Sequence, residues 1–225
     1  NDFFTQVNFN KEINKKLFNH SARNIKNKKT DKFWNNLGIV DLKQKKINSY
    51  QLDTEIILSK VMETRREKIL TNLEQDIELK KIIKFNNLIK RRSLKEPIAY
   101  LTNEKEFWSK KFEVNKNTLI PRPETELLVN DLLEKYKSKK IEILDVGTGS
   151  GCILIILLCF SKSSTGIGVD ISKNAISIAK KNALRHNLHN RVRFLNKSFE
   201  SIFGKKFDLI VSNPPYIERK DIKLS

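Results

Sequence analysis

A glycine-rich run offers the first site for chemistry. The chain has only seven glycines, and three of them fall in the run Asp145-Val146-Gly147-Thr148-Gly149-Ser150-Gly151. An apolar strand precedes this run and a helix follows it, which is the setting in which such a pattern indicates a binding loop. Glycine is needed where the backbone bends tightly and where a ligand lies against it with no Cβ between them. The run therefore predicts a ligand-binding loop, and a glycine-rich turn without a ligand is the structural alternative.

Two carboxylates narrow the choice of ligand. Asp170 lies 25 residues beyond Asp145, at the end of the next apolar strand, where it could accept both hydroxyls of a ribose. Asp145 puts negative charge where the pyrophosphate of a dinucleotide would lie, which disfavours NAD. A cationic ligand with an amino-acid end, such as S-adenosylmethionine, fits that charge. We expect the cofactor to be held by Asp145, Gly147, Thr148, Gly149, Ser150, Gly151 and Asp170.

The tetrapeptide Asn213-Pro214-Pro215-Tyr216 could act on the group that receives a methyl. It follows a later apolar strand, at the carboxyl edge of the sheet where open α/β folds bind their ligands. The side-chain oxygen of Asn213 and the carbonyl of Pro214 could each accept one N–H of a planar amide and orient its nitrogen. Tyr216 could pack against the same planar group. The two motifs together predict an N-methyltransferase with Asn213, Pro214 and Tyr216 as catalytic residues, whereas the tetrapeptide alone could be a rigid turn.

The composition limits the partners. The net charge of +18 indicates either an acidic or RNA-rich partner or an A/T-biased coding sequence that enriches Lys, Asn and Ile. No run approaches the roughly 20 apolar residues that a membrane helix needs. Cys152 and Cys159 share one apolar run and fit buried thiols, which indicates a reducing, cytoplasmic compartment. The three histidines have no cysteine or carboxylate cluster around them, so we expect no metal site.

The amino-terminal part is expected to be helical. Residues 34–92 carry apolar side chains at helical spacing, whereas residues 1–33 are polar, basic and weakly periodic. Pro97 is expected to end the helices, because its ring cannot continue one. Short aromatic and β-branched runs then predict a small antiparallel hairpin or ribbon over residues 99–102, 106–108 and 112–114. Two prolines, Pro121 and Pro123, stiffen a connector.

The remainder alternates apolar strands with helices. Strands are expected over residues 141–146, 166–170, 192–195 and 207–212, and helices over residues 124–136, 152–160 and 172–187. This order predicts an α/β fold, a Rossmann-like parallel sheet with right-handed crossovers. Four strands are few for such a sheet, so we expect it to be truncated at its C-terminal side. The expected domains are a basic extension of unknown role (1–33), a helical substrate-recognition domain (34–95), a hairpin and Pro-rich connector (96–123) and an incomplete methyltransferase domain (124–225).

These residues resemble those of the HemK/PrmC family of bacterial release-factor glutamine methyltransferases. The resemblance runs from Leu52 to Tyr216 and includes the glycine loop and the Asn-Pro-Pro-Tyr tetrapeptide. Its other motifs are Leu52-Asp53-x-Glu55, Glu96-Pro97-Ile98-Ala99-Tyr100-Leu101-Thr102, Glu106-Phe107-Trp108 and Ile120-Pro121-Arg122-Pro123-Glu124-Thr125-Glu126.

The resemblance implies methylation of the glutamine in the Gly-Gly-Gln loop of peptide chain release factors, with S-adenosylmethionine as the methyl donor. Residues 147–151 and Asp170 would hold the cofactor, Asn213 would face both cofactor and substrate, and the helical domain would grip the release factor. The substrate side would comprise Asn213, Pro214, Pro215, Tyr216, Arg122 and Glu124. The basic charge is consistent with a place near RNA or the ribosome.

The chain departs from the family pattern in three respects, one of which is the missing carboxyl-terminal part that completes the sheet in the family. Where the family usually carries an acid near the adenine, this chain has Asn196-Lys197-Ser198, and Ser198 and Phe199 remain the expected adenine neighbours. Asn103 stands where a hairpin glycine is common, and asparagine tolerates positive φ.

Three other functions compete with this interpretation. Asn-Pro-Pro-Tyr also fits adenine-N6 methyltransferases that act on DNA or RNA, and a sister group methylates a glutamine of a ribosomal protein. The helical domain and the Pro-Glu-Thr-Glu run favour release factors over both. A non-catalytic cofactor-binding protein is the alternative outside the enzymes.

Overall fold

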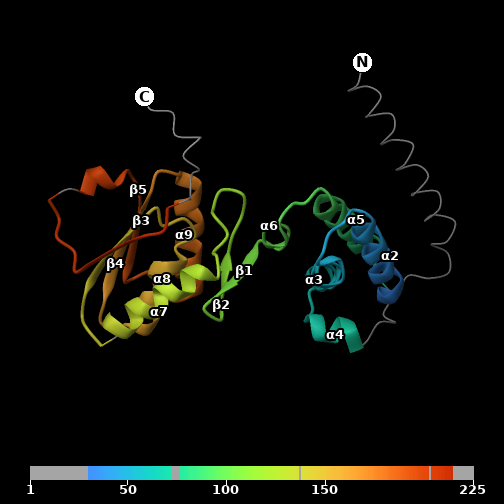
Figure 1. Ribbon diagram of the computed structural model, residues 1–225, viewed down its shortest axis with the longest axis horizontal. Coiled ribbons are helices and arrows are strands. Elements are labelled where there is room, and N and C mark those ends of the chain that lie inside the picture. The colour runs from blue at the N-terminus through green and yellow to red at the C-terminus, as the bar shows by residue number, and fades with distance from the viewer. Residues whose placement is uncertain (1–29, 72–76, 137, 203, 215–225) are drawn as a thin grey trace, which may run out of the picture. The chain divides into compact units, whose positions relative to one another are not determined.

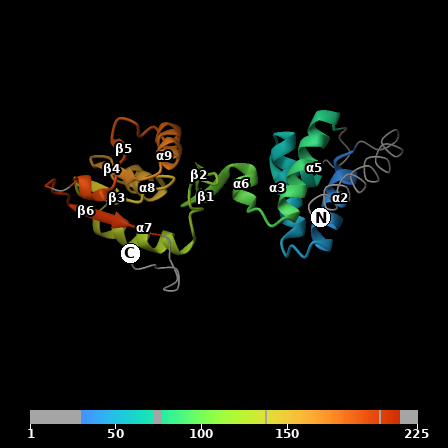
Figure 2. The same ribbon diagram turned by 90° about the horizontal axis from the view of Figure 1, so that it is seen from above.

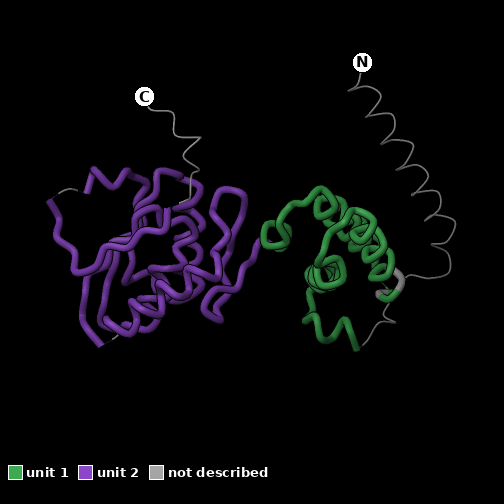
Figure 3. The backbone as a smooth tube through the Cα atoms, in the orientation of Figure 1, with its two compact units in different colours: residues 1–102 green, residues 103–225 purple. Residues whose placement is uncertain are grey.

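The computed structural model describes residues 30–71, 77–136, 138–202 and 204–214. The chain divides into two compact units, residues 1–102 and 103–225 (Figure 3). Residues 1–29 of the expected basic extension (1–33) lie outside the described residues.

The first unit is a helical bundle, as the apolar spacing predicts. Its helices are α2 (Asp31–Gln44), α3 (Tyr50–Met62), α4 (Arg66–Thr71), α5 (Leu79–Ser93) and the short α6 (Ile98–Thr102) (Figure 1). Their buried faces form a core of their own around Trp34, Ile57, Leu58 and Phe85.

A buried ion pair crosses this bundle. Arg92 of α5 donates from Nε to Oδ2 of Asp53 in α3 at 2.7 Å, and the hydroxyl of Ser49 donates to the same oxygen at 2.7 Å. The Asp53 side chain is almost completely buried. The two helices are therefore joined by a charge pair as well as by apolar packing.

The expectation that Pro97 ends the helices is wrong, and so is the extended conformation expected for residues 99–102. Helix α6 begins directly after Pro97, because proline is tolerated where a helix starts and no N–H partner is needed. The N–H groups of Tyr100 and Leu101 donate to the Pro97 carbonyl at 3.0 and 3.2 Å. Asn103 then leaves the helix at a φ of 55°, the left-handed conformation that asparagine tolerates.

The second unit opens with the expected hairpin. Strands β1 (Glu104–Phe107) and β2 (Lys110–Glu113) pair antiparallel, with Glu104 opposite Glu113. Trp108 and Ser109 form the two-residue turn with φ values of 52° and 54°, since two left-handed residues match the twist of the strands. Phe107 and Phe112 are both buried and attach the hairpin to the core of this unit.

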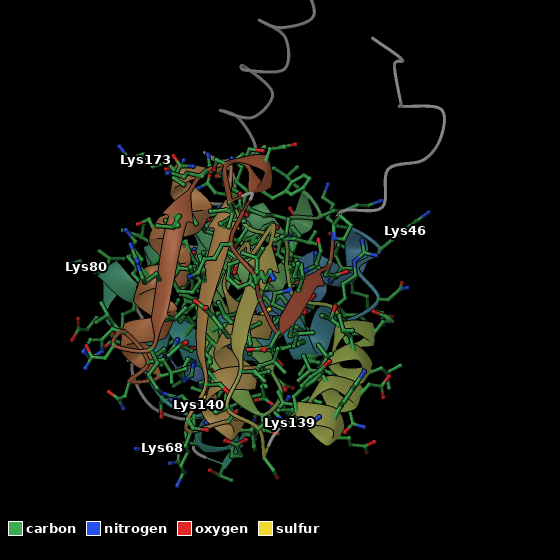
Figure 4. The ribbon with its side chains drawn as sticks, turned by 90° about the vertical axis from the view of Figure 1, so that its left-hand side faces the viewer. Lys46, Lys68, Lys80, Lys139, Lys140 and Lys173 are labelled. Atoms are coloured by element: carbon green, nitrogen blue, oxygen red, sulfur yellow. The ribbon has the colours of Figure 1, made fainter. Side chains whose placement is uncertain are left out.

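A four-stranded parallel sheet forms the centre of the second unit, as predicted. Its strands are β3 (Glu142–Val146), β4 (Thr165–Asp170), β5 (Val192–Asn196) and β6 (Leu209–Ser212), arranged in the order β5-β4-β3-β6. Three helices, α7 (Glu124–Tyr136), α8 (Cys152–Phe160) and α9 (Lys173–Arg185), contribute buried residues to one core with one face of the sheet. Figure 4 looks onto the opposite face, with the strands in front of these helices.

The opposite face carries a smaller apolar cluster. Leu144, Ile167 and Val169 are buried there, with Ile202 and Phe207 packed against them, while Ile210 is 63% exposed. The 3-10 helix η1 (Phe199–Ile202), which the periodicity does not predict, lies in the connection from β5 to β6.

The strand order decides where a ligand can bind. From β3 the chain passes to β4 and β5 on one side of the sheet, and then to β6 on the other side. Open α/β folds bind ligands at such a reversal, outside the carboxyl ends of the strands. The reversal here lies between β3 and β6.

Candidate functional site

The two motifs leave the sheet from neighbouring positions at this reversal. Strand β3 runs directly into the glycine loop and β6 runs directly into Asn213. Val146 and Ser212 are register partners, and the Ser212 hydroxyl donates to the Val146 carbonyl at 2.9 Å. The topology therefore brings together two segments that are far apart in the sequence.

The glycine loop is open on the side where a ligand would approach. Gly147 and Gly149 adopt φ values of 69° and 55°, and the N–H groups of Gly147 and Thr148 both donate to the Val169 carbonyl at 2.9 and 3.0 Å. A Cβ built on Gly147 would have no heavy atom within 4 Å, and one on Gly149 would meet only the Gly147 carbonyl, at 3.9 Å. The protein itself therefore leaves room for a ligand against this backbone, and the left-handed φ values disfavour any other residue.

Asp145 lies beneath the loop rather than on its open side. Its carboxylate is 1% exposed and accepts the Thr148 hydroxyl at 2.6 Å. Burial is the main cause that raises the pKa of Asp145 to about 6; the nearby Asp170 adds to the increase, and the Thr148 hydrogen bond opposes it. The side chain braces the loop and places a buried negative charge under it, and its direct contact with the cofactor stays a prediction.

Asp170 braces the loop from the end of β4. Its Oδ2 accepts the Gly149 N–H at 3.0 Å and its Oδ1 accepts the Ser172 N–H at 2.8 Å. The Ser172 hydroxyl in turn accepts the N–H of Ala175 and caps α9. The carboxylate that is expected to bind a ribose is thus held in place by two backbone donors.

The expected adenine neighbours follow β5, at the same edge of the sheet. The N–H of Lys197 donates to the Asp170 carbonyl at 3.1 Å, and the side-chain amide of Asn196 donates to the carbonyls of Asp170 and Ile171. Ser198 and Phe199 come next and are exposed. The structure therefore attaches their segment to the end of β4, beside the expected ribose position.

Asn213 is oriented by a residue that the sequence does not single out as functional. Its Nδ2 donates to Oγ1 of Thr125 at 2.9 Å, across 88 residues of sequence. Thr125 is 7% exposed and lies in the first turn of α7, which runs beside β6 (Figure 2). The only hint in the sequence is its place within the Pro-Glu-Thr-Glu run.

The expected substrate contacts lie partly within the described residues. Arg122 and Glu124 are exposed on either side of Pro123 at the start of α7, next to Thr125. Pro214 is exposed after Asn213, and Pro215 and Tyr216 lie outside the described residues. The structure thus brings the start of α7 to Asn213.

Asn182 of α9 is a second residue that the sequence analysis misses. It is completely buried, its Oδ1 accepts the N–H of Glu113 at 2.7 Å, and its Nδ2 donates to the carbonyls of Glu113 and Ser150 at 3.0 and 2.9 Å. One side chain thus ties α9 to both the hairpin and the glycine loop. The sequence does carry a signal for this role, because Asn182 is a polar residue within the apolar helix face formed by Ile178, Ala179 and Ala183.

Two further findings concern only the part of the chain that the structure describes. No three His, Cys, Asp or Glu side chains there are grouped so that they could hold a metal ion. No helix in those ranges is long and apolar enough to cross a membrane.

Known proteins match both units of the chain. Residues 35–102 match the PrmC N-terminal domain, and residues 123–225 match the methyltransferase small domain. The release factor glutamine methyltransferase of Buchnera aphidicola subsp. Acyrthosiphon pisum (strain APS) is 44% identical over 177 residues, which cover 79% of this chain and 64% of that protein. The protein of the same name from Buchnera aphidicola subsp. Schizaphis graminum (strain Sg) is 46% identical over 171 residues, covering 76% and 62%.

The chain spans less than two thirds of the length of either relative. Among solved structures, a ribosomal protein L11 methylase from Lactobacillus delbrueckii subsp. bulgaricus is 29% identical over 41% of this chain and 47% of that one, with a TM-score of 0.37.

Proposed function

We propose that this chain, which belongs to the HemK/PrmC family, transfers a methyl group from S-adenosylmethionine to the side-chain amide of a protein glutamine. Its substrate is the glutamine of the Gly-Gly-Gln loop of peptide chain release factors. The observation that carries the proposal is the side chain of Asn213, which is fixed at the end of β6 beside the glycine loop.

The residues around the loop fit S-adenosylmethionine. The free space against Gly147 and Gly149 admits a ligand, Asp170 offers carboxylate oxygens for a ribose, and the buried charge of Asp145 favours a cation. When bound, the cofactor supplies an electrophilic methyl group on a positively charged sulfur. Ser198 and Phe199 complete the site at the adenine.

The chain's own residues orient the amide nitrogen. Asn213 Oδ1 and the Pro214 carbonyl each accept one N–H of the substrate glutamine, which turns its nitrogen towards the methyl group. These hydrogen bonds strengthen as positive charge develops on the nitrogen. The proton leaves after transfer, so no general base is needed, and Tyr216 packs on the amide plane.

The release factor is held by the helical unit together with Arg122 and Glu124. The net charge of +18 suits an approach to the ribosome, where release factors act. The compartment is the cytoplasm, where thiols such as Cys152 and Cys159 stay reduced.

Methyl-labelled cofactor tests the proposal directly. We expect label on a release factor, and none on duplex DNA, on ribosomal proteins or on a release factor whose loop reads Gly-Gly-Glu. Label on DNA instead would favour an adenine methyltransferase. Asn213→Ala should lower the rate by a factor on the order of 100, because it removes an acceptor used in the transition state. Its cofactor affinity, measured by calorimetry, should change far less.

A further inference from the structure

The amide of Asn213 can serve the proposed reaction in only one orientation. Its carbonyl oxygen accepts hydrogen bonds and its NH2 group donates them. The amide nitrogen of a glutamine also carries two N–H groups, so it needs an acceptor from Asn213. If the side-chain amide were rotated by half a turn, the NH2 group of Asn213 would face the NH2 group of the substrate glutamine.

In the structure the hydrogen bond to Thr125 uses the NH2 group of Asn213 and leaves its oxygen for the substrate. Thr125 Oγ1 accepts this hydrogen bond from Asn213 Nδ2 at 2.9 Å. Because Oδ1 and Nδ2 lie on opposite sides of the planar amide, this bond turns Oδ1 away from Thr125.

Thr125 is itself held on a rigid element. It shares one face of α7 with Val129 and Leu133, at spacings of four residues, and both of these pack into the main core of the unit. Its N–H donates to the Arg122 carbonyl at 3.0 Å. The next residue, Glu126, accepts the Trp108 N–H at 2.8 Å, which fixes the same helical turn to the hairpin.

The backbone that carries Asn213 is fixed as well. Strand β6 pairs with β3 up to Ser212, and the Ser212 hydroxyl donates a hydrogen bond to the Val146 carbonyl. Both partners of the hydrogen bond between Thr125 and Asn213 therefore stand on packed elements, as a preorganised catalytic group requires.

We propose that Thr125 is a positioning residue, which holds the Asn213 amide with its oxygen towards the substrate nitrogen. This inference rests on the proposed function. Thr125 acts only through Asn213 and does not itself touch the reacting atoms.

Three variants of the full chain test this role. Thr125→Val keeps the shape but removes the acceptor, and it should lower kcat about tenfold or more with little change in the KM for cofactor. Thr125→Ser keeps the hydroxyl and should restore most of the rate.

The matched control is Thr118→Val, because Thr118 is also buried in this unit and bonds the backbone of Asn115. It should lower the melting temperature without lowering kcat. Unchanged kcat in Thr125→Val, or an equal loss in Thr125→Ser, would overturn the proposal.

A double-mutant cycle tests whether Thr125 works through Asn213. Adding Thr125→Val to Asn213→Ala should cause no further loss of rate, because the group that it positions is already gone. Additive losses would show that Thr125 acts in another way.

A readout without turnover separates this inference from the proposed function. The side-chain NH2 resonances of Asn213 should shift in Thr125→Val and not in Thr118→Val. Wild-type protein that methylates no release factor would contradict the proposed function, whatever the NH2 resonances do. Unshifted resonances in Thr125→Val would contradict the inference even if the wild-type enzyme is active.

Discussion

The carboxylates of Asp145 and Asp170 brace the glycine loop in different environments. Asp170 accepts two backbone N–H groups at the end of β4, whereas Asp145 is buried and bonded to the hydroxyl of Thr148. Gly149 connects this bracing to the ligand side, since its N–H bonds Asp170 and its open side faces the expected ligand. Cofactor affinity is therefore expected to depend on the geometry of this loop as well as on direct contacts.

Substitutions at Gly149 and Asp170 test the cofactor site. Gly149→Val forces a branched side chain into a left-handed conformation and fills the open side, and Asp170→Ala removes both the brace and the expected ribose acceptor. Each should weaken S-adenosylmethionine binding by at least about tenfold, or 1.4 kcal/mol. Gly204→Val is the matched control, because Gly204 also has positive φ and free space around its Cβ position. Unchanged S-adenosylmethionine affinity in both variants, measured by calorimetry, would contradict the assignment of this loop as the cofactor site.

The raised pKa of Asp145 predicts a pH-dependent stability. The folded chain holds this proton up to about pH 6, whereas the ordinary pKa of an aspartate side chain is 3.8. The unfolding free energy therefore falls as pH rises through this window, by an amount on the order of 3 kcal/mol. Asp145→Asn still accepts the Thr148 hydroxyl and cannot ionise. It should be more stable than the wild type at neutral pH, and urea titrations should show the difference vanishing near pH 4. A difference that is constant across this range would contradict the effect of burial.

At the scale of elements, α9 holds the hairpin and the glycine loop through Asn182. That side chain satisfies the N–H and carbonyl of Glu113 and the carbonyl of Ser150. Buried polar groups that lose their partner are costly, because the protein interior offers them no water. The position of the loop therefore depends on a helix that follows it in the sequence.

Asn182→Ala should be strongly destabilising. It leaves three backbone groups without their partner, at a cost of about 3 kcal/mol or more in unfolding free energy. Because Ser150 lies in the loop, cofactor affinity should fall as well. Asn174→Ala, at an exposed site on the same helix, serves as the control and should cost less than about 1 kcal/mol. Equal melting temperatures for the two variants would show that the Asn182 hydrogen bonds contribute little.

At the scale of the whole molecule, the two units have separate cores. Trp34, Ile57 and Phe85 belong to the core of the helical unit, while Ile143, Leu154 and Phe194 belong to that of the methyltransferase unit. All residues expected to hold the cofactor lie in the second unit. Damage to the first unit should therefore spare cofactor binding and impair use of the protein substrate.

Arg92→Met tests this division. It leaves the buried Asp53 without its cation, which should cost about 3 kcal/mol in the stability of the helical unit. Cofactor affinity should stay within about twofold, while methylation of a release factor should fall. Lys90→Met, at an exposed position on the same helix, should change neither. A loss of cofactor affinity in Arg92→Met would show that the two units are energetically coupled.

Most elements of the second unit could be predicted from the amino-acid sequence alone. Helix α8 spans Cys152–Phe160 as expected, and β3 to β5 begin and end within about one residue of the predicted bounds. These predictions succeed because apolar runs, periodicity and glycine placement are local properties that the chain keeps when it folds. The left-handed conformation of Asn103 follows from the residue type in the same way.

Local patterns failed where a residue's neighbours in space decide its conformation or role. Residues 99–102 have the composition of a strand, yet Pro97 starts a helix there and Leu101 packs into the helical core. The 3-10 helix η1 and the late start of β6 at Leu209 were likewise not predicted.

Which distant residues meet depends on how the elements pack in the folded chain. The order β5-β4-β3-β6 puts the end of β6 beside the glycine loop, and the packing of α7 then brings Thr125 to Asn213. Asn182 reaches Glu113 and Ser150 by the same kind of packing. A hydrogen bond between residues 88 positions apart leaves no periodic trace in the sequence. It forms only because two separately packed elements end at the same edge of the sheet.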